Sequence, residues 1–332
     1  MNISEFNYHL PKELIAHQKS KHSRLLVYKK HSKEIIITDF DELARTLLPT
    51  DHLVFNNTKV IPARLKATKQ TGGAVEIFIE RILSDDEAVV MVRSNSKLKL
   101  PLDLNLNEHG AVSVTHQLTD QLFKASFSLG APLLEYLNQY GRTPTPPYIK
   151  NPLDQKIDYQ TVFAQHAGSC AAPTAGLHFT KKMMEQLHCQ KSFITLHVGL
   201  GTFNPVRSED IEIHMMHHER FHVSEEAAQQ LNHVQRPNQR VIAVGTTSAR
   251  TLESVYLNNR YQAKEDETNL FIYPGYQFKA IDGLLTNFHL PKSTLFMLVC
   301  AMIGTENAHR CYKKAIDNQM RFFSYGDAML IL

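Results

Sequence analysis

The stretch at residues 240–255, RVIAVGTTSARTLESV, constrains the fold more than any other part of the chain. Residues 241–244 form a short, wholly apolar run, which is typical of a strand buried on both faces of a sheet. Gly245 gives the backbone freedom for a sharp turn, and the hydroxyl-rich sequence at 246–248 can cap a helix. We therefore expect a buried strand, a tight turn and a helix here.

Such a turn brings unpaired backbone N–H groups and the positive end of a helix dipole to one point. That arrangement suits an anion such as a carboxylate or a phosphate. A capped turn without a ligand is the simpler interpretation of these residues alone, so the rest of the chain has to decide between the two.

With 332 residues the chain is long enough for two domains. Its 43% hydrophobic and 21% charged residues are an ordinary soluble composition, and a net charge of +3 permits a nucleic-acid partner without requiring one. The cysteines form no CxxC pair, which favours reduced thiols. The N-terminal sequence lacks the features of a signal peptide, and the longest apolar run near the C-terminus, 295–304, is too short to span a membrane. We expect a soluble, cytoplasmic protein.

Two parts of the chain differ in their hydrophobic pattern. Within 61–129, short segments alternate apolar and polar residues with a period of two, as at 75–79. This pattern predicts an inserted small β-barrel or sandwich domain, residues 63–148. Lys97 and Lys99 of this domain could face RNA, although a solvated loop is the simpler explanation.

Residues 1–62 and 149–332 instead alternate helix and strand patterns. We expect, for example, a helix at 159–166 and a strand at 270–273. This alternation favours a layered α/β domain with a mostly parallel sheet.

Several familiar signatures are absent. The sequence GLG at 199–201 lacks the third glycine of a dinucleotide fingerprint, and KST at 292–294 follows no glycine-rich loop. The sequence GTTS at 245–248 is not a nucleophile elbow. Histidines at 214, 217, 218 and 222 have no carboxylate or cysteine set at a known ligand spacing, so we expect no metal site.

Four segments concentrate Gly, Thr, His and Pro: residues 172–180, 196–203, 245–250 and 286–291. Three of them follow predicted strands. In an open α/β sheet, ligands bind outside the carboxyl ends of the strands. These segments are therefore expected to converge on one site.

With these four segments included, the motifs of the chain closely resemble those of the S-adenosylmethionine:tRNA ribosyltransferase-isomerase family of queuosine biosynthesis. The resemblance runs over nearly the whole length and is weakest at 81–130. It rests on strings that follow one another in family order: LVFNNTKVIPARL, TPPYI, YQTVFA, AAPTAGLHFT, TLHVGLGTF, AVGTTSARTLES, FIYPGYQF, TNFHLPKSTL and RFFSYGDAML.

The resemblance implies an α/β domain with an inserted barrel and a transferase that also isomerises its sugar. The ribosyl part of S-adenosylmethionine would move onto 7-aminomethyl-7-deazaguanine at the wobble position of tRNA, which forms epoxyqueuosine and releases adenine and methionine. No metal or further cofactor is expected. The implied partners are this tRNA and S-adenosylmethionine, and the implied state is a cytoplasmic monomer.

This chemistry needs a general base, because the sulfonium acidifies the adjacent ribose carbon, and a proton donor for departing adenine. His178, His197 and His289 lie in the three densest motifs, and His178 is the first choice for the base. A structural histidine that holds a loop is the alternative for each.

The same motifs suggest substrate-binding residues. A methionine carboxylate would suit the turn at 246–248 with Arg250 beside it, and packing as a helix residue is the equal alternative for Arg250. Aromatic side chains could stack on adenine or on the extruded tRNA base, with core packing as the alternative. The candidates are Thr174, Gly176, Phe179, Gly201, Thr246, Thr247, Ser248, Arg250, Asn287 and Tyr148, with Phe203 and Phe288 as further aromatics.

Some positions depart from the family pattern. Asn57 stands where aspartate is usual, which puts an acid role there in doubt, and Ile157-Asp158 replaces the usual arginines. Two rival functions remain: an RNA-binding protein without catalysis that uses the barrel, and a hydrolase built on Ser248 and a histidine.

Overall fold

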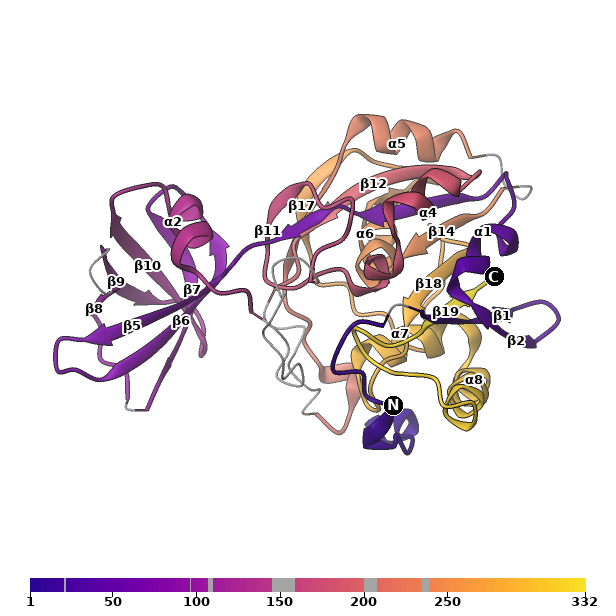
Figure 1. Ribbon diagram of the computed structural model, residues 1–332, viewed down its shortest axis with the longest axis horizontal. Helices are drawn as coiled ribbons and strands as arrows, with labels where there is room; N and C mark the ends of the chain where they lie inside the picture. The colour runs from indigo at the N-terminus through magenta and orange to yellow at the C-terminus, as the bar shows by residue number, and fades with distance from the viewer. Residues whose placement is uncertain (21, 96, 107–109, 145–158, 200–207, 235–238) are drawn as a thin grey trace. The chain divides into compact units, whose positions relative to one another are not determined.

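A computed structural model describes the chain except for residues 21, 96, 107–109, 145–158, 200–207 and 235–238 (Figure 1). The chain divides into two compact units. The larger unit contains Met1–Thr58, Pro147–His166 and Ala172–Leu332, and the smaller unit contains Lys59–Pro146 and Ala167–Ala171. The sequence-based boundaries at 62/63 and 148/149 stay a prediction, and they leave out the return of Ala167–Ala171 to the smaller unit.

The larger unit is built on a nine-stranded mixed sheet in the order β17-β13-β12-β3-β14-β18-β19-β1-β2. Strands β12, β3, β14 and β18 run parallel, and β1 is parallel to β19. The other neighbours are antiparallel. The expected α/β class is confirmed, with the parallel strands at the centre and antiparallel strands toward both edges. The strand bounds are β1 Arg24–Lys29, β2 Glu34–Asp39, β3 His52–Asn56, β12 Gln190–Leu196, β13 Glu219–Val223, β14 Val241–Val244, β17 Lys264–Thr268, β18 Gly283–Asn287 and β19 Ala328–Ile331.

Every residue of β3, β14 and β18 is buried, which is why β14 and the middle of β3 and β18 are continuous apolar runs rather than alternating patterns. Helix α6 (Thr246–Val255) packs against these three strands and β12. A core cluster also joins Leu53 and Phe55 of β3 to Leu43 and Phe179, which lie outside the sheet. Burial on both faces therefore fixes the middle of the sheet.

The remaining helices of this unit are short at its N-terminal side and longer at its C-terminal side. None of the helices in the described ranges combines the length and apolarity that crossing a membrane requires. The elements are the 3-10 helices η1 Ile3–Phe6, η2 Lys12–Leu14, η3 Phe40–Glu42, η5 Thr174–His178 and η7 Ile211–Ile213, the α-helices α1 Leu43–Thr46, α4 Lys181–Gln186, α5 Glu225–Asn232, α7 Thr294–Ile303 and α8 Thr305–Asp317, and the paired strands β15 Tyr256–Leu257 and β16 Arg260–Tyr261.

The smaller unit is a closed antiparallel barrel in the order β10-β7-β6-β5-β8-β9. Val75, Ile77 and Ile79 of β6 are buried, in agreement with the period of two in the sequence. The expected inserted β-barrel is therefore confirmed. Its elements are β5 Arg64–Lys69, β6 Ala74–Ile82, β7 Glu87–Ser94, β8 Leu102–Asn105, β9 Gly110–Gln117, β10 Leu122–Leu129 and α2 Leu133–Tyr140; β4 Thr58–Val60 pairs separately with β11 His166–Ser169.

Two predicted elements are wrong. The described part of the expected helix at 159–166 consists of turns that lead into β11, and the N–H groups of Gln165 and His166 donate to the Asn57 carbonyl (2.7 and 3.3 Å). Residues 270–273 form no strand, since the strand lies earlier, in the charged sequence of β17. In both places a partner distant in sequence replaces the pattern that the local sequence suggests, since the Arg250 side chain donates to the Leu270 carbonyl (2.8 Å).

Candidate active site

The carboxyl ends of β12, β3, β14 and β18 lie at one edge of the sheet because these strands are parallel neighbours. Three of the four polar segments singled out in the sequence begin at these ends, at residues 196–203, 245–250 and 286–291. Asn56, the last residue of β3, joins the strand ends. Its amide donates to the Leu196 carbonyl (3.0 Å) and to Thr247 Oγ1 (3.2 Å) and accepts from the Leu196 N–H (3.0 Å). Asn56 thus links β12 to the start of α6.

The fourth segment joins the same edge through Asn287, the last residue of β18. Thr174 Oγ1 of η5 donates to Asn287 Oδ1 (3.0 Å), and Asn287 Nδ2 lies 3.0 Å from His178 Nε2. The Asn287 amide therefore holds both ends of η5. Three residues from two distant motifs form one hydrogen-bonded group at the end of β18, which we name the Asn287 group.

His178 is partly buried within this group, and the ring of Phe40 stacks on it at 4.8 Å between centroids. Burial, followed by the positive charges of Lys19 and Arg321, lowers the pKa of His178 to about 3. The ring is therefore neutral at pH 7, which is the form that a general base requires.

His289 has a different environment. Its side chain is buried, its Nε2 lies 2.9 Å from Thr286 Oγ1, and its backbone N–H donates to the Tyr312 hydroxyl (3.2 Å). The Tyr8 hydroxyl donates to its carbonyl. Burial lowers the pKa of His289 to about 3. These contacts give His289 the structural role of anchoring the loop after β18, which was the alternative for this histidine, and its catalytic role stays a prediction.

His197 follows β12 and is partly exposed. Its Nδ1 lies 2.8 Å from Thr58 Oγ1, and its backbone N–H donates to the Arg220 carbonyl (2.9 Å). Burial lowers its pKa to about 4, with Arg220 and His166 contributing in the same direction. Strands β3 and β14 separate β12 from β18, so three strand spacings put His197 about 14 Å from the end of β18. His178 and His197 therefore mark opposite ends of the same edge.

Strand β14, a turn at Gly245 and helix α6 follow one another, as the sequence predicts. Gly245 has φ of 91°, a left-handed value that favours glycine. Ser248 is fully buried, and its hydroxyl donates to the Val244 carbonyl (2.9 Å). This contact and the burial of Ser248 argue against a hydrolase nucleophile, and the expected role of Ser248 in substrate binding stays a prediction. Thr246 is almost buried, and Thr247 remains partly exposed at the edge.

Arg250 has the contacts expected of the alternative, a residue that packs within the fold. Its side chain is only 7% exposed and pairs with the equally buried Glu219 of β13. Its Nε donates to the Leu270 carbonyl (2.8 Å), and Glu219 Oε1 accepts from the Gly199 N–H (3.4 Å). The guanidinium therefore joins α6 to β13 and is not offered to a substrate carboxylate.

The surroundings of two aromatic candidates and one glycine candidate indicate packing roles. Phe179 packs edge-on to Phe40 and Phe55, and Phe288 is fully buried, so neither ring is open to a base. A Cβ at Gly176 would lie 2.8 Å from carbons of Phe163 and Thr161, so this glycine allows η5 to pack closely. Tyr148, Gly201 and Phe203 lie outside the described residues, as does Ile157-Asp158.

Asn57 is buried beside the edge. Its Oδ1 accepts from Thr195 Oγ1 (2.7 Å), and its Nδ2 lies 3.4 Å from Gln165 Oε1. An amide can accept from one partner and donate to the other, whereas an aspartate carboxylate can only accept. Asn57 therefore has a structural explanation that needs no acid.

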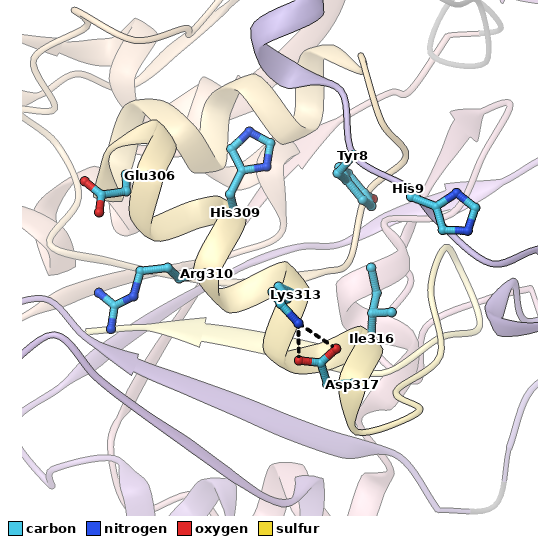
Figure 2. Close-up of a pocket in the computed structure, with 8 residues that line it drawn as sticks. All are labelled: Tyr8, His9, Glu306, His309, Arg310, Lys313, Ile316 and Asp317. Atoms are coloured by element: carbon cyan, nitrogen blue, oxygen red, sulfur yellow. Dashed lines mark hydrogen bonds and ion pairs between the residues drawn. The ribbon is translucent and has the colours of Figure 1, made fainter.

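The pocket that the structure describes does not lie at this edge of the sheet. Among the residues that the structure describes, no three His, Cys, Asp or Glu side chains are placed to hold a metal ion together. A pocket of about 620 Å³ lies instead between the N-terminal segment and α8, where the Lys313 ammonium pairs with Asp317 (2.7 Å) (Figure 2). The pocket is lined by Tyr8, His9, Glu306, His309, Arg310, Lys313, Ile316 and Asp317, and it contains none of the predicted site residues.

Sequence reasoning missed Asn56, Phe40 and Glu219. Asn56 lies in the string LVFNNTKV, where the pair of asparagines after an apolar strand was a usable signal. Phe40 and Glu219 have no such signal, because their roles depend on residues far away in the chain.

The fold and the site define an α/β protein with an inserted antiparallel barrel and a histidine–amide group at the carboxyl edge of its sheet. The chain belongs to the queuosine biosynthesis protein family, whose model matches residues 3–331. The resemblance drawn from the sequence motifs is therefore confirmed.

Known relatives are similar over their full lengths. The S-adenosylmethionine:tRNA ribosyltransferase-isomerase of Coxiella burnetii (strain RSA 331 / Henzerling II) is 45% identical over 336 residues, which cover 99% of this chain and 98% of the relative. That of Caldanaerobacter subterraneus is 46% identical over 341 residues, all of both chains. A crystal structure of S-adenosylmethionine tRNA ribosyltransferase from Thermotoga maritima is 33% identical, with a TM-score of 0.57 over 99% of this chain and 100% of that one.

Proposed function

We propose that this chain transfers and isomerises the ribosyl group of S-adenosylmethionine onto 7-aminomethyl-7-deazaguanine at the wobble position of tRNA, forming epoxyqueuosine and releasing adenine and methionine. Family membership and full-length relatives named for this activity support the reaction. The observation that carries the site is the Asn287 group, which holds a neutral histidine at the edge where four parallel strands end.

His178 is the proposed base for the ribose carbon next to the sulfonium. As placed, Asn287 Nδ2 faces His178 Nε2, so the neutral ring carries its proton on Nδ1. Turning the Asn287 amide over keeps both contacts of the group, because the Thr174 hydroxyl can accept as well as donate. The ring then donates from Nε2, and Nδ1 is free to take the proton. Asn287 thereby becomes a positioning residue that selects the tautomer.

A base with a pKa near 3 binds a proton only weakly. Because burial and two cations cause the low value, an anionic group of the substrate beside His178 would raise the pKa and strengthen the base. The substrate itself can thus activate His178, while the free enzyme keeps it neutral.

The other proposed contacts lie along the same edge. Thr246 and Thr247 at the start of α6 can contact S-adenosylmethionine, and His197 is the histidine at the far end of the edge that can face adenine or the tRNA base. We propose no metal and no further cofactor. The chain is expected to act as a monomer in the cytoplasm, and the four free cysteines agree with a reducing compartment.

The deciding experiment incubates the purified protein with S-adenosylmethionine and tRNA carrying 7-aminomethyl-7-deazaguanine, and it follows adenine release by chromatography. Adenine should form in proportion to modified tRNA. The matched control is the same tRNA with unmodified guanine at the wobble position, which should give none. Binding of modified tRNA without any adenine release would establish the RNA-binding alternative and refute the transferase.

A further inference from the structure

The turn at 321–327 is tightly built. The Asp327 N–H donates to the Arg321 carbonyl (2.7 Å), and the Gly326 N–H donates to the Phe323 carbonyl (2.9 Å). Phe323 has φ of 78°, an uncommon value for a bulky residue, and a Cβ at Gly326 would lie 2.5 Å from the Arg321 carbonyl oxygen. A non-glycine residue held in this conformation is a feature that occurs often at functional sites.

This turn lies beside the Asn287 group. The Phe323 N–H donates to the Phe288 carbonyl (3.0 Å), and Ala328, which follows the turn, pairs with Asn287 across β18 and β19. Figure 1 shows these two strands next to each other in the sheet. Backbone contacts alone therefore place the turn next to the residue that holds His178.

The Arg321 side chain has a donor group without a hydrogen-bond partner in the turn. Its Nη2 is buried without a hydrogen-bond partner, and its shortest ion-pair contact is 3.6 Å, to Asp327 Oδ1. The Asp327 carboxylate already accepts from the backbone N–H groups of Arg24 (2.9 Å) and Arg321 (2.8 Å). The Arg321 side chain is 28% exposed as a whole, so it lies at the protein surface although its Nη2 is covered. A buried donor without a partner carries a free-energy penalty that an incoming acceptor would remove.

We propose that Arg321 binds the carboxylate of the methionine part of S-adenosylmethionine, in the role that the sequence suggested for Arg250. This inference rests on the proposed function of the Asn287 group. A guanidinium recognises a carboxylate through paired N–H donors. The carboxylate of S-adenosylmethionine is only a few bonds from the sulfonium, so a carboxylate held by Arg321 leaves the acidified ribose carbon close to His178. Its negative charge also opposes the cations that keep the pKa of His178 low.

Arg24 offers a matched control. It pairs with the same Asp327 carboxylate (3.3 Å), and its Nη1 also donates to the Asn318 carbonyl (2.7 Å). Arg24→Gln therefore removes more contacts inside the protein than Arg321→Gln. If Arg321 only stabilises Asp327, Arg24→Gln should be at least as harmful as Arg321→Gln. Thermal melts of both variants establish that each is folded.

The test measures kcat and KM for S-adenosylmethionine at saturating modified tRNA, and for tRNA at saturating S-adenosylmethionine. Arg321→Gln should raise KM for S-adenosylmethionine about tenfold to a hundredfold, the range for losing one charge-assisted hydrogen bond, and leave KM for tRNA unchanged. Arg24→Gln should change neither. Equal effects of the two variants, or a rise in KM for tRNA alone, would overturn the proposal, and the second result would assign Arg321 to a tRNA phosphate.

A truncated substrate identifies the group that is bound. Dimethylsulfonio-deoxyadenosine keeps the sulfonium and adenosine but lacks the amino-acid part, so wild type and Arg321→Gln should use it equally well. A loss on Arg321→Gln as large as that with S-adenosylmethionine overturns the proposal.

Equilibrium dialysis with radiolabelled S-adenosylmethionine, in the presence of modified tRNA, separates this proposal from the proposed function. Weaker binding by Arg321→Gln but not by Arg24→Gln supports the carboxylate site even if no adenine is released. Unchanged binding by Arg321→Gln, or none by wild type, overturns it.

Discussion

The buried pair of Arg250 and Glu219 gives the sharpest test of the site assignment. The two side chains are 7% and 5% exposed. Removing one partner of a buried ion pair leaves an uncompensated charge and typically costs about 3–5 kcal/mol. Arg250→Met should therefore lower the melting temperature by roughly 6–20 °C, at 2–4 °C for each kcal/mol in a domain of this size. The expected damage is to stability and not to substrate recognition.

The double variant Arg250→Met/Glu219→Leu separates the charge effect from lost packing. It should recover part of the single-variant loss, because no buried charge remains unpaired. Recovery stays incomplete, since the Leu270 carbonyl and the Gly199 N–H each lose a partner, at about 1–3 kcal/mol apiece. Thermal melts followed by circular dichroism give the stabilities. KM for S-adenosylmethionine, measured well below the melting temperature, should stay within about twofold of wild type. A variant Arg250→Met that melts like wild type and has a tenfold higher KM would refute the structural assignment.

Two further predictions concern histidines. His178→Gln should lower kcat by about a hundredfold to ten-thousandfold while leaving KM for S-adenosylmethionine and the melting temperature nearly unchanged, as steady-state adenine release and thermal melts would reveal; wild-type kcat would exclude His178 as the base. His289 should make the fold less stable in acid: its pKa is about 3 in the folded chain and 6.5 in the unfolded chain, so between these values the unfolded state binds the extra proton and stability rises with pH. At pH 5 the penalty is about 2 kcal/mol, and urea unfolding of His289→Gln at pH 5 and 7 should show a smaller loss on acidification than wild type; an identical loss in both proteins would contradict this.

The sequence predicts the parts of the fold that local pattern controls. Strands β3, β14 and β18 contain continuous apolar runs because they are buried on both faces, and β6 alternates because one face of a barrel strand points inward. The failures at 159–166 and 270–273 have a common origin. Both segments are held by hydrogen bonds to residues far away in sequence, Asn57 in one and Arg250 in the other.

The same distinction applies to the candidate site. The motifs around His178, Thr247 and Asn287 are recognisable in the sequence, and parallel strand order brings their segments to one edge. The partners of individual side chains were not predictable. In the sequence, Arg250 is a candidate anion ligand near the start of a helix. Only the structure shows that Glu219 lies beside it.

By itself the sequence determined the class of the fold, the inserted barrel, the family and the segments that build the site, because hydrophobic period, turn residues and motif strings are properties of neighbouring residues. Only the tertiary structure decided which polar groups are satisfied inside the protein and which remain open to a ligand. Ser248, Arg250 and His289 are closed by contacts within the fold, whereas Arg321 keeps a guanidinium nitrogen without a hydrogen-bond partner. Hydrogen-bond satisfaction depends on pairs that are distant in the chain and adjacent in space, and a local pattern carries no information about such pairs.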